Sequence, residues 1–191
     1  MMKEARSAVL MLIAMTVVTG VIYPLIVTGI AQVAFPGEAN GSLLSRDGKV
    51  VGSSLIGQGF TDPKYFWSRL SATSPTGYNG DASSGSNYGP LNKALSDAVT
   101  ARVDALVNAD PQHRKPVPVD LVTSSASGLD PHVTPAGARY QVARVAQARA
   151  LDPAAVQRLV DEHTEGRLLG VLGEPRVNVL ELNLALDASG R

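Results

Sequence analysis

The feature that most constrains this chain is an uncharged N-terminal stretch. Between Ser7 and Gly37 there is no Asp, Glu, Lys or Arg, and most residues are Val, Ile, Leu, Met or Ala. A helix of roughly 20 apolar residues is long enough to cross the hydrocarbon core of a bilayer. Residues 7–36 are therefore predicted to form a transmembrane anchor helix, and every later segment must lie on one side of that membrane.

A cleaved secretory signal peptide is the competing interpretation, because Lys3 and Arg6 form a short basic region ahead of the apolar stretch. The apolar core of a signal peptide is only about 7–15 residues long. Here the apolar run continues well past Gly20, and the only match to a cleavage site is the weak triplet Gly29-Ile30-Ala31. The length of the run favours a retained anchor.

The same two basic residues orient the anchor. After Lys3 and Arg6 no Lys or Arg follows until Arg46, and basic residues flanking a span stay on the cytoplasmic side. The predicted order is a cytoplasmic segment at 1–6, the anchor at 7–36, a polar connector at 37–48 and an extracytoplasmic domain at 49–191.

Small or polar residues recur at every fourth position of the anchor and form a stripe along the helix. These residues are Thr16, Gly20, Pro24, Thr28 and Gln32. Small residues let helices approach closely in lipid, and Thr or Gln can form hydrogen bonds across such a contact. The stripe predicts packing against partner helices, although a lone anchor that faces lipid also tolerates scattered small residues. Pro24 lacks a backbone donor and is expected to kink the helix.

Composition excludes several classes of function for the rest of the chain. Net charge is +0, and no basic run is longer than His113-Arg114-Lys115, which argues against nucleic acid as a partner. The sequence has no Cys, so disulfides, thiolate metal sites and Cys nucleophiles are all excluded. The 155 residues that follow position 36 are enough for one domain with its own core.

Periodicity and capping signals predict a small α/β or α+β domain with about three strands and three helices. Strands are expected at 49–56, 117–122 and 177–186, and helices at 87–109, at 134–150 and from Asp152 onward. The last two helices open on Thr134-Pro135 and Asp152-Pro153, an N-cap residue followed by proline. A glycine-bounded hinge is expected at 166–173.

The segment 60–89, called the aromatic loop below, has turn residues and no helical period. It holds six of the nine aromatic residues of the chain, which are Phe60, Tyr65, Phe66, Trp67, Tyr78 and Tyr88. A loop of this length is uncommon and is usually functional when it is ordered. The aromatics predict that it is held by packing, either as a functional surface or as a small core of its own.

No motif predicts catalysis or a metal site. Gly80–Gly85 has the glycine spacing of a phosphate loop but lacks the following Lys, so an ordinary turn, or an amide nest for an anion, is expected. The three His residues are far apart, without the spacing of metal ligands. Ser127, Asp130 and His132 could be drawn as the triad of a freestanding hydrolase, but Asp-Pro-His more often forms a turn. The residues alone predict a membrane-tethered, non-enzymatic partner protein.

Several stretches resemble a known family across nearly the whole chain. They are VPVDLVTSSASGLDPHVTPAGARYQVARVAQARAL at 117–151, LGVLGEPRVNVLELNLALD at 169–187, GSSLIGQGF at 52–60, YFWSRLSAT at 65–73, YN at 78–79 and SGSNYGPLN at 84–92. They are similar to the KdpC subunit of the bacterial Kdp potassium-transporting P-type ATPase. Leu70 stands where that family usually has Pro, which bears only on the local shape of the loop.

The resemblance implies a small accessory subunit in the bacterial inner membrane. Its expected partners are a channel-like potassium-binding subunit, a P-type ATP-hydrolysing subunit and a small single-span subunit. The chain has no D-K-T-G phosphorylation motif and no potassium filter sequence, so no catalytic residue, no metal ligand and no cofactor of its own are expected.

The family has also been described as raising the ATP affinity of the pump subunit. That role makes five residues candidate ATP contacts by resemblance, namely Ser124, Ser125, Ser127, Gly128 and Gln141. Two hypotheses follow, assembly of the complex from outside the membrane and direct handling of ATP. They conflict, because the charge bias places these residues outside while ATP is cytoplasmic.

Overall fold

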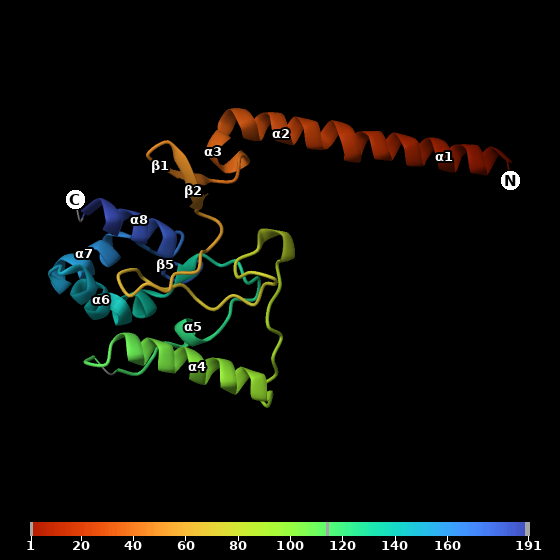
Figure 1. Ribbon diagram of the computed structural model, residues 1–191. Coiled ribbons are helices and arrows are strands. Elements are labelled where there is room, and N and C mark those ends of the chain that lie inside the picture. The colour runs from red at the N-terminus through yellow and green to blue at the C-terminus, as the bar shows by residue number, and fades with distance from the viewer. Residues whose placement is uncertain (1, 114, 190–191) are drawn as a thin grey trace. The chain divides into compact units, whose positions relative to one another are not determined.

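The computed structural model of the chain describes residues 2–113 and 115–189 and consists of two compact units that meet between Val51 and Gly52 (Figure 1). Each unit is described on its own. Three predicted features extend beyond the described residues. These are the start of the N-terminal segment at residue 1, the central Arg114 of the basic triplet, and the end of the outer domain at 190–191.

The first unit begins with one long helix. It comprises α1 (Met2–Val17), the π-helical turn η1 (Val18–Ile22) and α2 (Tyr23–Ala34). Together these 33 residues form a helix that is long and apolar enough to cross a membrane, and the chain buries none of their side chains. The prediction of a single N-terminal apolar helix is confirmed.

The effect of Pro24 is a change of helix type just before it. The backbone N–H of Tyr23 donates to the carbonyl of Val18, five residues back. Pro24 has no N–H to continue the regular four-residue pattern of hydrogen bonds. Such π-helical turns within α-helices are rare and are found mostly at functional positions.

The segment after the long helix, predicted to be a polar connector at 37–48, contains regular secondary structure. It contains the short helix α3 (Pro36–Ala39) and a two-stranded sheet of β1 (Leu43–Arg46) and β2 (Lys49–Ser53). Asp47 and Gly48 join the strands with φ angles of 50° and 76°, the left-handed backbone that a two-residue hairpin turn needs. The strand expected at 49–56 is therefore present over its first five residues.

The second unit combines a small sheet with helices. Strand β5 (Arg176–Asn178) lies between β3 (His132–Val133) and β4 (Thr164–Glu165), and both pairings are antiparallel, with Val177 opposite Val133 and Thr164. The helices and the 3-10 turn are η2 (Gly80–Ala82), α4 (Lys93–Ala109), α5 (Val119–Val122), α6 (Pro135–Arg149), α7 (Pro153–Glu162) and α8 (Val179–Ser189). Helix α7 packs against α6 and α8, and α4 lies along α5 (Figure 1).

Both capping predictions are confirmed. The Thr134 side chain accepts a hydrogen bond from the backbone of Gly137 at 3.0 Å and starts α6. Asp152 does the same for Ala154 at the start of α7, also at 3.0 Å. Local hydrogen-bonding chemistry is enough to specify such helix starts.

The strand expected at 117–122 is wrong, since residues 119–122 form the helical turn α5. No neighbouring strand pairs with this segment in the part of the chain that the structure describes. Instead Asp120 is buried and its carboxylate accepts the Thr134 N–H at 2.7 Å. A Cβ on Gly137 would lie 2.7 Å from the same carboxylate, so glycine is needed there.

The strand expected at 177–186 is also wrong beyond its first residues. The chain leaves β5 at Asn178, whose side-chain oxygen accepts the N–H groups of Leu180 and Glu181 at 3.1 and 3.2 Å. This is an N-cap, and the three-residue spacing from Asn178 to Glu181 matches that of a capping box. A helix, α8, follows.

The helix expected at 87–109 starts later than predicted. Asn92 caps α4 by accepting the Ala94 N–H at 2.9 Å, and Leu91, which precedes this cap, is fully exposed. Within the helix, Leu106 is buried and Val99 and Val103 pack against the core.

Two leucines of α8 test the correction of 177–186 directly. A strand would place Leu182 and Leu184 on one face, whereas the helix buries Leu182 completely and leaves Leu184 half-buried. We expect Leu182→Ala to lower the free energy of unfolding by about 3 kcal/mol, because it leaves a cavity in the core. Leu184→Ala should cost about 1 kcal/mol or less. Urea unfolding followed by Trp67 fluorescence measures both, and equal losses would restore the strand.

Candidate functional site

The aromatic loop passes through the centre of the second unit and is held there by two side-chain amides. Asn183 of α8 accepts the Phe66 N–H at 2.8 Å and donates to the Phe66 carbonyl at 3.0 Å. Gln141 of α6 likewise accepts the Trp67 N–H at 2.7 Å and donates to the Trp67 carbonyl at 3.1 Å. Each amide thus satisfies both backbone groups of one residue, as a neighbouring strand would. These two amides are called the amide clamp below.

Arginines complete the support around Trp67. The guanidinium of Arg144 lies 4.5 Å from the centre of the Trp67 ring and that of Arg102 lies 5.2 Å from it. Arg144 also donates to the Tyr65 carbonyl at 3.0 Å and to Gln141 at 2.6 Å. Burial lowers the pKa of Arg144 to about 10, and it also lowers the pKa of Arg102. Both groups stay charged at neutral pH and are used to hold the loop.

The later part of the aromatic loop is held by hydroxyl groups. The Ser71 hydroxyl donates to the Gly128 carbonyl at 2.7 Å, and the Tyr78 hydroxyl donates to the Arg69 carbonyl at 2.6 Å. Burial raises the pKa of Tyr78, which keeps it a donor. The prediction that the aromatic loop is ordered by packing is confirmed, since Phe66 and Trp67 are buried.

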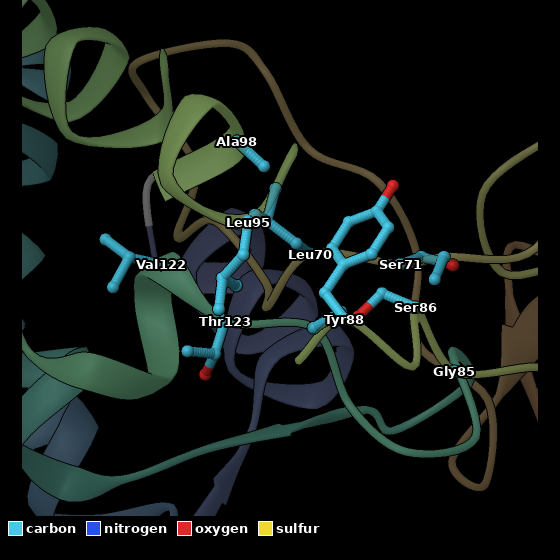
Figure 2. A pocket seen from close by; sticks show the side chains of 11 residues that line it. Leu70, Ser71, Gly85, Ser86, Tyr88, Leu95, Ala98, Val122 and Thr123 are labelled. Atoms are coloured by element: carbon cyan, nitrogen blue, oxygen red, sulfur yellow. The ribbon is translucent and has the colours of Figure 1, made fainter. Parts of the chain in front are cut away.

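A pocket of about 390 Å³ lies where this loop meets α4 and the segment after α5 (Figure 2). Ser86 and Tyr88 come from the aromatic loop, Leu95 from α4, and Thr123 and Ser124 from the chain after α5. The remaining lining residues are Leu70, Ser71, Ala72, Gly85, Ala98 and Val122. The lining is therefore apolar side chains and hydroxyl groups.

This pocket offers a concave surface for a ligand, but none of its side chains is suited to acid–base chemistry. None of its lining residues is Asp, Glu, His, Lys or Arg, so it offers no charge to neutralise a phosphate and no general base. The glycine-spaced segment at 80–85 begins with the short turn η2 (Gly80–Ala82), where Asn79 accepts the Asp81 N–H at 3.1 Å. An ordinary turn, and not a phosphate loop, is what the structure has there.

The five candidate ATP contacts are not gathered into one site. Ser124 lines the pocket, Ser125 is buried, and the backbone of Ser127 and Gly128 holds the aromatic loop through Ser84 and Ser71. Gln141 is 1% exposed and belongs to the amide clamp.

The amide of Gln141 has no free hydrogen-bonding position. Its oxygen accepts from Trp67 and Arg144, and its nitrogen donates to the carbonyls of Trp67 and Gly137. A nucleotide contact at Gln141 would therefore require this part of the core to open, and the ATP contacts remain a prediction.

Ser127, Asp130 and His132 form a turn. Asp130 accepts the His132 N–H at 3.0 Å and pairs with Arg69 at 3.0 Å, and the Ser127 hydroxyl accepts the Leu129 N–H at 3.2 Å. Burial of Asp130 works against its charge, but the hydrogen bonds from His132 and Arg69 outweigh it and lower its pKa. No described hydrogen bond joins Ser127 to His132, so the geometry gives the hydrolase alternative no support.

Among the described residues no group of three or more His, Asp or Glu side chains is placed to hold a metal ion. The residues that sequence reasoning missed are Asn183, Arg102 and Arg144, which hold the aromatic loop. Nothing local in the sequence marks them, because Asn183 and Phe66 are 117 positions apart.

The structure shows the surroundings of two residues of the predicted anchor stripe, Gly20 and Gln32. A Cβ on Gly20 would be 3.9 Å from Thr16, an ordinary contact. The Gln32 amide pairs with the amide of Asn40, at 3.1 Å in one direction and 3.4 Å in the other. Gln32 is thus bonded within its own unit, while Thr16, Pro24 and Thr28 are exposed, and their packing against other helices remains a prediction.

Comparison with known proteins gives one consistent result. A family model described as "KdpC: K+-transporting ATPase, c chain" matches residues 5–188. A Sorangium cellulosum protein named potassium-transporting ATPase KdpC subunit is 62% identical, over 99% of this chain and 100% of its own length. Proteins of the same name from Dechloromonas aromatica and Herpetosiphon aurantiacus are 64% and 65% identical, over 96% and 95% of this chain and 96% and 94% of their own lengths.

Proposed function

The chain belongs to the KdpC family, the c chain of the K+-transporting ATPase, and we propose that it is a non-catalytic accessory subunit of an ATP-driven potassium-uptake complex. Its partners in this proposal are a channel-like potassium-binding subunit, a P-type ATP-hydrolysing subunit and a small single-span subunit. It assembles and stabilises these subunits, while ion selection and ATP hydrolysis belong to them.

The observation that carries the proposal is how the charged and amide groups of the second unit are used. Arg102, Arg144, Gln141 and Asn183 bind the backbone or the rings of the aromatic loop. The pocket of Figure 2 has only hydroxyl and apolar groups. A pocket without an acid or a base, in a unit whose buried polar groups hold the aromatic loop, suits assembly better than catalysis.

We further propose that the protein is a single-pass protein of the bacterial inner membrane. Residues 1–6 lie in the cytoplasm, the rest of the N-terminal helix spans the bilayer, and the second unit lies outside. Lys3 and Arg6, with no further basic residue before Arg46, support this orientation. The alternative, in which the chain raises the ATP affinity of its partner by binding ATP at Ser124 to Gln141, needs the second unit in the cytoplasm.

The orientation can be tested with single cysteines, because the chain has none of its own. Val119 is 72% exposed and Met2 is 89% exposed. With a maleimide that does not cross membranes, we expect Val119→Cys to be labelled in right-side-out vesicles and Met2→Cys only in inside-out vesicles. The reverse pattern would place the second unit beside cytoplasmic ATP, and it would support the alternative.

Assembly through the anchor stripe has a matched pair of glycines for its test. Gly20 belongs to the stripe, whereas Gly29 lies nine positions further on, close to the opposite face of a helix with 3.6 residues per turn. Neither position is crowded within the chain. When the chain is expressed with its partner subunits, Gly20→Leu should reduce their co-purification severalfold, because a bulky side chain prevents close helix approach.

Gly29→Leu is the control and should leave co-purification unchanged, with equal membrane insertion of both variants. Equal recovery of the partners with Gly20→Leu and with the unsubstituted chain would count against the packing stripe.

A further inference from the structure

The segment between β4 and β5 forms an exposed apolar hairpin. It runs from Arg167 to Glu174 and is called the apolar hairpin below. Leu168, Leu169, Val171 and Leu172 are 67%, 85%, 72% and 57% exposed. The segment was expected to be a hinge, but Leu168 and Leu172 pair as an antiparallel bridge and close it into a tight turn. Four adjacent exposed aliphatic side chains contribute nothing to the core and need another explanation.

Most backbone N–H groups of the hairpin tip are hydrogen-bonded within the hairpin. Leu168 donates to the Leu172 carbonyl at 2.9 Å and Leu172 donates back at 3.0 Å. Gly170 and Val171 donate to the carbonyls of Arg167 and Leu168 at 3.1 and 3.2 Å. An unsatisfied N–H group costs several kcal/mol in an apolar medium, so these internal bonds lower the cost of moving the tip out of water.

Leu169 has an unfavourable backbone conformation that contacts of its side chain do not offset. Its φ angle is 53°, in the left-handed region that favours glycine or asparagine over a bulky residue. Its side chain is 85% exposed, so leucine gains nothing from packing at this position. A costly backbone conformation that presents an apolar side chain outward points to a role outside the folded unit.

Charge is confined to the base of the hairpin. Arg167 pairs with Glu174 through both carboxylate oxygens, at 2.7 and 2.9 Å. Behind this pair, Arg176 and Glu165 are 2.8 Å apart. The apolar hairpin thus has an uncharged tip with no polar side chain and a polar base, the sequence of groups that matches the passage from hydrocarbon to headgroups.

We propose that the tip of the apolar hairpin inserts into the lipid surface, as a second membrane contact besides the N-terminal helix. A protein partner would normally be anchored by aromatic or Arg side chains and would pair with polar groups, and the tip has neither. A bilayer is also within reach. Between Ala34 and Gly52 the chain forms α3, β1 and most of β2, so a chain anchored by its N-terminal helix keeps the second unit near a bilayer surface. This last point rests on the anchoring proposed above.

Nitroxide labels at three valines replaced by cysteine test the insertion. Val171→Cys labels the tip, and Val119→Cys is the matched control, since both valines are 72% exposed. Val21→Cys labels the N-terminal helix. The full chain, without other subunits, is placed in vesicles of phosphatidylethanolamine and phosphatidylglycerol. Collision rates are then measured with oxygen, which concentrates in lipid, and with a nickel chelate, which stays in water.

We expect the ratio of oxygen to nickel collisions to be severalfold higher at position 171 than at 119. An equal ratio at 171 and 119 would overturn the insertion. So would a label at 171 that is open to water in the lone chain and is shielded from both reagents only after assembly, because that result identifies a protein partner.

The label at position 21 separates this inference from the proposed function. A lipid signal at 21 together with an aqueous signal at 171 overturns the hairpin contact and leaves the anchor intact. An aqueous signal at 21 overturns the anchor, whereas a lipid signal at 171 supports the hairpin contact whatever is found at 21.

Discussion

The amide clamp is the interaction on which the second unit depends. Gln141 and Asn183 bind both backbone groups of two consecutive residues, Trp67 and Phe66, where the aromatic loop is neither strand nor helix. Buried backbone groups must be paired, and an unpaired one costs about 1–3 kcal/mol. Two side chains from α6 and α8 therefore do for this loop what a neighbouring strand does elsewhere, and they allow irregular chain to pass through the core.

This arrangement determines what the polar residues of the unit can do. All hydrogen-bonding positions of the Gln141 amide are occupied. The guanidinium groups of Arg144 and Arg102 lie over the Trp67 ring and donate to nearby carbonyls. The role of a buried polar residue in holding the fold of this unit therefore has to be considered before any role in binding a ligand. The same reasoning gives weight to the apolar hairpin, whose side chains take no part in the core and are free to contact something else.

Local features of the fold could be predicted from the sequence, and features that depend on distant contacts could not. Thr134 and Asp152 start helices through neighbours two or three positions away. The leucines of 177–186 fit a strand as well as a helix, and it is the Asn178 cap on the Leu180 and Glu181 N–H groups that favours the helix. Asp47-Gly48 is a local hairpin signal of the same kind. The amide clamp joins residues 74 and 117 positions apart, which no local pattern reveals.

Hydrogen exchange resolved at single backbone amides tests the amide clamp most directly. If Gln141 and Asn183 hold the loop as described, the N–H groups of Phe66 and Trp67 exchange as slowly as those in the middle of α6. They also exchange far more slowly than the exposed turn at Asp81 in the same loop. Exchange at Phe66 and Trp67 as fast as at Asp81 would show that the loop opens freely, and it would contradict the role given to the amide clamp.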